Sequence, residues 1–136
     1  MLENQKINIK IKLAALWTSV MFCYVYGDYF ELYAPEKVES LISGVNVLDS
    51  PIKLLIASIV LVIPALMIAL SILLKPSINK LFNIVFGILY TLLMVLIAAT
   101  SITPWYAFYV FLGVVESCIT ASIVWHAWKW PKNITE

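Results

Sequence analysis

Four long apolar runs, separated by shorter polar segments, set the pattern of this 136-residue chain. A transmembrane helix needs about 20 predominantly apolar residues, and the pattern predicts spans over residues 13–33, 52–74, 81–101 and 105–128. The connections between the second, third and fourth spans are short, which makes successive helices antiparallel neighbours. We therefore expect residues 1–136 to form one all-α domain, an integral membrane four-helix bundle with antiparallel helices.

Turn and capping residues support these boundaries. The sequence DSP at 49–51 offers a cap followed by proline at the first helical position, and TP at 103–104 repeats this pattern before the fourth span. Pro64 is expected to kink the second span, because proline removes a backbone hydrogen bond. The segment PEKVESLISG, residues 35–44, spaces its apolar residues on one helical face. It predicts a short amphipathic helix on the outer membrane surface.

Composition strengthens the membrane interpretation. The chain is 62% hydrophobic and 12% charged, with a mean hydropathy of +0.95, whereas a soluble domain of this size needs a larger polar surface. The expected partner is the lipid bilayer. The net charge of +1 gives no reason to expect nucleic acid as a partner.

The lysines are unevenly distributed among the polar segments. Most of the nine fall before the first span, between the second and third, or after the fourth: Lys6, Lys10, Lys12, Lys75, Lys80, Lys129 and Lys132. The positive-inside rule places these segments in the cytoplasm. We therefore expect a multi-pass protein of the cytoplasmic (inner) membrane with both termini in the cytoplasm.

Polar residues recur on one face of three of the spans. The stripes are Trp17, Met21, Tyr24, Asp28 and Glu31; Asn83, Gly87, Tyr90, Thr91 and Met94; and Tyr109, Gly113, Glu116 and Thr120. Polar groups facing lipid are costly, so these faces should point into the bundle. Small residues at Gly113, Ser117 and Ala121 repeat every four positions, which predicts close packing of Gly113 and Ala121 against a neighbouring helix.

The carboxyl groups in the spans have no basic neighbour in the sequence. The segment YVYGDYFELY, residues 24–33, contains Asp28 and Glu31, and Glu116 lies near the middle of the fourth span. A charge at that depth costs at least about 2.5–3.5 kcal/mol. Such carboxyls are protonated, share a proton or a cation, or await a basic or hydroxylated ligand. We expect Glu116 to be protonated and Asp28, nearer the outer surface, to be ionised, with hydrogen bonds from Tyr24 and Tyr29.

The sequence has few features suited to metal binding, nucleophilic catalysis or phosphate binding. A single histidine, and two cysteines outside any C-x-x-C pair, predict no metal site. No serine or cysteine has a histidine partner placed by spacing, and no phosphate-binding glycine loop occurs. We predict no cofactor and identify no catalytic residue.

The two ends of the chain resemble those of a known group of proteins. Residues 16–36 (LWTSVMFCYVYGDYFELYAPE) and 114–131 (VVESCITASIVWHAWKWP) resemble an uncharacterised family of short four-span bacterial membrane proteins, loosely similar to the DoxX-like group. The resemblance spans the chain and rests on Trp17, Tyr24, Asp28, Glu116, Trp125 and Trp128. It implies four spans in a bacterial inner membrane and no particular activity, because the family is one of unknown function.

Three functional hypotheses follow. The first is a protein that binds or transports a proton or a small lipophilic or cationic ligand in an outward-opening cleft lined by Trp17, Tyr24, Asp28, Tyr90, Tyr109 and Glu116. The second is a membrane enzyme acting on a lipid or quinone-like substrate, with Asp28 and Glu116 as acid and base. The third is a non-catalytic accessory or scaffold subunit. The first is favoured, and the sequence is also compatible with a homo-oligomer.

Overall fold

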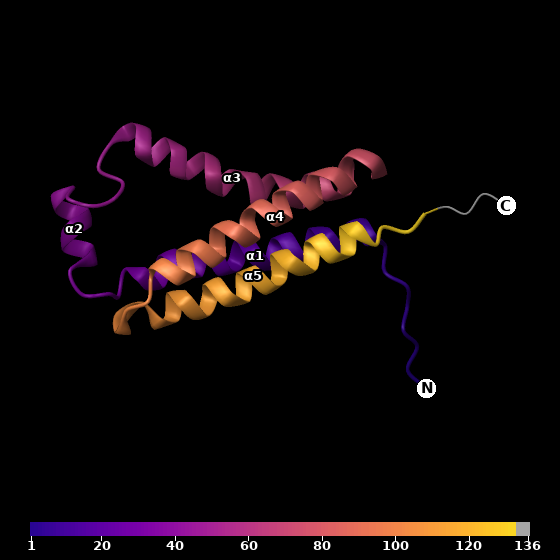
Figure 1. The fold of residues 1–136 in the computed structure, drawn as a ribbon, viewed down its shortest axis with the longest axis horizontal. Coiled ribbons are helices and arrows are strands. Elements are labelled where there is room, and N and C mark those ends of the chain that lie inside the picture. Colours follow the sequence, from indigo (N-terminus) through magenta and orange to yellow (C-terminus); the bar gives the residue numbers. More distant parts are fainter. Residues whose placement is uncertain (133–136) are drawn as a thin grey trace.

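The computed structural model describes residues 1–132, and within them the chain is built from helices and loops (Figure 1). The elements are α1 (Ile9–Glu31), α2 (Lys37–Ser43), α3 (Pro51–Leu73), α4 (Pro76–Thr100), the 3₁₀ turn η1 (Pro104–Tyr106) and α5 (Ala107–Trp128). In the described residues, α1, α3, α4 and η1 with α5 are long and apolar enough to cross a membrane. The predicted all-α four-helix bundle is confirmed, and the protein is a small multi-pass membrane protein.

The long helices pack in a chain of neighbours. α3 packs on α1, α1 on α5, and α5 on α4, and successive helices run in opposite directions (Figure 1). α1 begins and α5 ends at one end of the bundle, and α2 lies at the other. α3 and α4 meet in only a few places, and the first half of α3 diverges from the other helices, with no buried residue over 51–62. The close pairing expected of these two helices therefore holds only locally.

Capping explains where the helices begin. The Asn8 side chain accepts a hydrogen bond from the Lys10 amide at 2.9 Å, so α1 begins four residues before the predicted span. Ser50 caps α3 from the predicted position, ahead of Pro51. Pro76 opens α4, five residues before the predicted start. Proline suits the first turn because its missing N–H has no helical partner there.

The short helix predicted in the loop after the first span is α2. It ends before Gly44, whose φ of +73° is the left-handed conformation that glycine adopts most readily. No residue of α2 is buried. The helix is therefore confirmed, and its contact with the membrane surface remains a prediction.

The orientation of the bundle in the membrane also remains a prediction, which thiol labelling can test. Ser43 and Ser77 are exposed at opposite ends of the bundle. After replacement of Cys23 and Cys118, we expect an impermeant thiol reagent applied to intact cells to label Ser43→Cys and to leave Ser77→Cys unlabelled, because the lysine-rich end should be cytoplasmic. Labelling of Ser77→Cys alone would reverse the orientation.

Candidate functional site

The predicted inward-facing stripes on α1, α4 and α5 are largely buried, as the cost of exposing polar groups to lipid requires. Trp17, Tyr24, Tyr90, Glu116 and Thr120 are all buried. The same faces contribute Leu13, Val20, Met94, Ile123 and Ala127 to one core, which Met67 of α3 completes. Five stripe members differ from the prediction: Asp28 is exposed, and Met21, Glu31, Thr91 and Tyr109 are only partly buried.

Trp17 belongs to a buried amide network rather than to an open cleft. Its Nε1 donates to Asn83 Oδ1 at 2.8 Å, and the Asn83 amide donates to Asn79 Oδ1 at 2.7 Å. Asn79 in turn donates to the backbone carbonyl of Ser71 at 2.6 Å, and the Ser71 hydroxyl lies 3.3 Å from Asn83 Oδ1. The network joins α1, α3 and α4 and satisfies its own polar groups. Sequence reasoning found Trp17 and Asn83 but missed Ser71 and Asn79, which lie at the ends of their spans.

The hydroxyl of Tyr90 is also engaged by the protein. It donates to the backbone carbonyl of Val60 on α3. Val60 lies four residues before Pro64, and proline lacks the N–H that would otherwise bond to this carbonyl. Tyr90 therefore satisfies a carbonyl that Pro64 leaves without a helical partner, and it fixes α4 to α3 at that point.

Tyr24 of α1 and Glu116 of α5 are buried residues of two helices that pack on each other. The Tyr24 hydroxyl is buried and is the one buried side-chain polar atom in residues 1–132 without a hydrogen-bond partner. Glu116 is 5% exposed as a residue; its backbone carbonyl accepts from the Thr120 hydroxyl at 3.0 Å, and its carboxyl, whose oxygens are not fully buried, makes no hydrogen bond with any described residue. Both groups therefore lack a hydrogen-bond partner within the described residues.

Asp28 and Tyr109 lie on the outer side of this pair. The Tyr109 ring packs beside Gly27, where an added Cβ would stand 3.9 Å from Tyr109 Cε2. Asp28 follows Tyr24 by four residues on α1, so the two lie on the same side of that helix, and Tyr109 lies seven residues before Glu116 on α5. The expected hydrogen bonds to Asp28 from Tyr24 and Tyr29 are not formed, since Tyr29 pairs with Tyr33 at 3.1 Å and Tyr24 has no partner. That part of the prediction is wrong.

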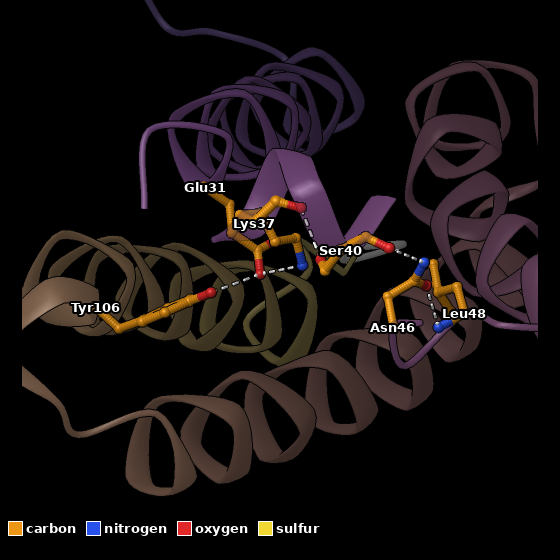
Figure 2. Close-up of polar contacts among 6 residues, drawn as sticks. All are labelled: Glu31, Lys37, Ser40, Asn46, Leu48 and Tyr106. Carbon is orange, nitrogen blue, oxygen red and sulfur yellow. Dashed lines mark hydrogen bonds and ion pairs between the residues drawn. The ribbon is translucent and has the colours of Figure 1, made fainter. Parts of the chain in front are cut away.

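Glu31 is held by groups from two other segments. Lys37 of α2 forms an ion pair with its carboxylate at 2.8 Å, and the Tyr106 hydroxyl donates to the same oxygen at 3.3 Å (Figure 2). Farther along, Asn46 binds the Ser40 carbonyl and the Leu48 amide. Lys37 is thus a basic partner for the YVYGDYFELY segment, but its ion pair is with Glu31. Asp28 and Glu116 remain without an ion pair.

Four side chains of α1 and α5 remain without an ion pair or a hydrogen bond in the preceding description. We call them the α1–α5 site: Tyr24, Asp28, Tyr109 and Glu116. They offer two carboxyls, two phenols and no base, which suits a proton or a cation. No group of three metal-ligating side chains suited to a metal ion occurs in the described chain. Two surface cavities, of about 340 and 570 Å³, lie at the two ends of the bundle and are lined by other residues.

Comparison with known proteins gives one match for this chain, a family model. No curated protein and no solved structure matches it. A family model described as a family of unknown function, DUF6326, matches residues 2–136. The resemblance to an uncharacterised family is thereby confirmed, while the likeness to the DoxX-like group remains an expectation. The chain belongs to the family of unknown function DUF6326.

Proposed function

We propose that the protein binds a proton or a small organic cation at the α1–α5 site, as a binding or transport protein of the membrane. The observation that supports this most strongly is the buried Tyr24 hydroxyl, which has no hydrogen-bond partner, on the face of α1 that packs on α5, the helix that carries the buried residue Glu116. The polar groups of the nearby Asn83 network are all satisfied. This contrast supports the choice of the α1–α5 site as the place where a ligand binds.

The energetics of burial favour such a ligand. A buried hydroxyl without a partner costs about 1–3 kcal/mol, and an ionised carboxyl deep in a bilayer costs at least about 2.5–3.5 kcal/mol. A proton on Glu116 removes the second cost. An organic cation beside Glu116 removes it as well, and the Tyr109 ring adds a cation–π contact. The two occupants compete for one carboxyl, so binding of the cation should release the proton.

Trp17 and Tyr90 have a supporting part in this proposal. The Tyr90 ring lies 6.4 Å from that of Tyr24 and 6.1 Å from that of Trp17, measured between centroids. Because the polar atoms of Trp17 and Tyr90 are bonded to Asn83 and Val60, their rings form a fixed wall behind Tyr24. A purely structural subunit would not need a buried hydroxyl without a partner, and no feature of the described residues favours the enzyme hypothesis.

Binding of tetraphenylphosphonium to the protein in nanodiscs tests the proposal. Glu116→Gln keeps the shape of the protonated acid but removes its charge, and we expect it to weaken binding about 30-fold or more. The reason is that loss of one partner of a buried charge pair costs about 2–5 kcal/mol, and each 1.4 kcal/mol is a factor of ten. Asp28→Asn, at an exposed position, should weaken binding less. Isothermal titration calorimetry measures both affinities.

Glu39→Gln is the matched control, because Glu39 is an exposed carboxylate on α2. It should bind the cation like the wild type. Infrared difference spectra test the proton separately, since the protein without cation should show a protonated-carboxyl band that Glu116→Gln removes. Unchanged cation affinity in Glu116→Gln, together with no such band, would overturn the proposal.

A further inference from the structure

The larger cavity lies at the end of the bundle where α1 begins and α5 ends. Its volume is about 570 Å³, and its walls come from the segment that leads into α1 and from the last turn of α5. Lys6, Lys12 and Lys129 line it, and no acidic residue does. It is separate from the α1–α5 site and shares no residue with it.

The lysines at this end of the molecule have two distinct environments. Lys10 donates to the carbonyl of Leu74 at 2.7 Å, and Lys80 donates to that of Trp128 at 3.1 Å, so both cap the ends of helices. The three cavity lysines make no ion pair with any described residue. Lys129 lies 3.8 Å from the centre of the Trp125 ring. The cavity therefore concentrates positive charge that helix capping does not use.

The start of α1 adds to the attraction for an anion, and His126 lines the same cavity. His126 Nδ1 lies 2.7 Å from the Ser122 carbonyl, a contact that requires the proton on Nδ1. His126 Nε2 is then left without a partner among residues 1–132, on a residue that lines the cavity. The first turn of α1, with its cap Asn8 on the cavity wall, presents the positive end of the helix dipole.

The surroundings of the cavity are those of a membrane interface. Trp125 and Trp130 line it, and Trp125 is 57% exposed. Tryptophan is enriched at the level of lipid headgroups. Ile11 in the first turn of α1, next to the cavity residue Lys12, is also exposed and offers an apolar contact to an acyl chain. We propose that this cavity binds the phosphate group of an anionic phospholipid, the ligand that basic pockets between transmembrane helices recognise.

Native mass spectrometry of the purified protein tests this assignment, with dioleoyl phosphatidylglycerol and dioleoyl phosphatidylcholine as probes. Lys12→Gln with Lys129→Gln should weaken phosphatidylglycerol binding about 25-fold, because each lysine near an anionic lipid surface contributes a factor of about five. Lys75→Gln with Lys132→Gln is the control. It removes the same charge from exposed lysines at the same end of the bundle, and neither residue lines the cavity.

The proposal requires that phosphatidylglycerol bind more tightly than phosphatidylcholine and that only the cavity variant lose this preference. An equal loss in both variants would assign the effect to general surface charge and overturn the site. A third arm uses inorganic phosphate in place of lipid and monitors thermal stability. Stabilisation of the wild type by millimolar phosphate, lost in the cavity variant, would reassign the site to a soluble phosphate compound and overturn the lipid assignment.

Discussion

Replacement of Asn83 with leucine is expected to destabilise the bundle by about 2 kcal/mol or more. Trp17 Nε1 and Asn79 Oδ1 would both remain buried without their hydrogen-bond partner, at about 1–3 kcal/mol each. Hydrogen bonds measured in membrane proteins average nearer 0.6 kcal/mol, because the unfolded chain also finds partners in the bilayer. The lower end of the summed range is therefore the appropriate expectation. Thermal unfolding in detergent, followed by circular dichroism, measures the loss.

Two further variants separate the network from a general effect of removing an amide. Asn46→Leu removes an asparagine with two hydrogen bonds in the loop between α2 and α3, and it should leave the unfolding temperature of the bundle nearly unchanged. Trp17→Phe removes the Nε1 donor that would lose its hydrogen-bond partner in the Asn83→Leu variant. Combined with Asn83→Leu, it should cost less than the sum of the single changes. Full additivity would contradict a direct contact between Trp17 and Asn83.

Much of the architecture could be predicted from local patterns. Apolar length alone identified the four spans, because lipid forces every backbone group to bond within its own helix. PEKVESLISG signalled α2 through its proline and glycine. The helix starts at Asn8 and Pro76 lay outside the predicted spans, because apolar runs locate the hydrophobic section of a helix and polar turns extend beyond it.

The arrangement of the helices was less predictable. Short loops correctly indicated antiparallel order, yet α3 turns away from α4 and leaves residues 51–62 unburied. Nothing local in the sequence encodes that divergence. The hydrogen bond from Tyr90 to Val60 could not be predicted for the same reason, because it depends on how α3 and α4 cross. Pro64 was a usable signal, since a proline within a span always leaves one carbonyl in need of a partner.

The candidate site illustrates how far helical periodicity reaches. It correctly placed Tyr24 and Glu116 on buried faces, and α1 and α5 bring those faces together. Periodicity does not show whether a buried polar group has a hydrogen-bond partner, so it grouped Trp17 and Tyr90 with Tyr24. It also assigned Ala121 to the packing face with Gly113, and that is wrong, because Ala121 is exposed. A four-residue repeat drifts around a helix of 3.6 residues per turn, and eight residues carry it off the contact.

Because of that drift, Gly113 is buried whereas Ala121, on the same helix, is exposed, so the two positions can be compared directly. At Gly113, an added Cβ would stand 3.1 Å from Ala98 Cβ, 3.6 Å from the Met94 carbonyl oxygen and 3.8 Å from Ala98 Cα. These atoms belong to the backbone or are fixed to it, so no side chain can rotate to make room. Gly113→Leu should therefore force α5 away from α4. Overpacking of this kind costs about 1–3 kcal/mol and occasionally more.

Ala121→Leu adds a similar volume to the same helix at an exposed position, and lipid or detergent can accommodate it. We expect it to unfold at the wild-type temperature, whereas Gly113→Leu unfolds several degrees lower. Gly113→Ala should lie between them, because a shift of a few tenths of an ångström relieves the contact with Ala98. Comparable destabilisation by both leucine substitutions would contradict the assigned α4–α5 interface and would indicate that Ala121 also faces a partner, such as a second copy of the chain.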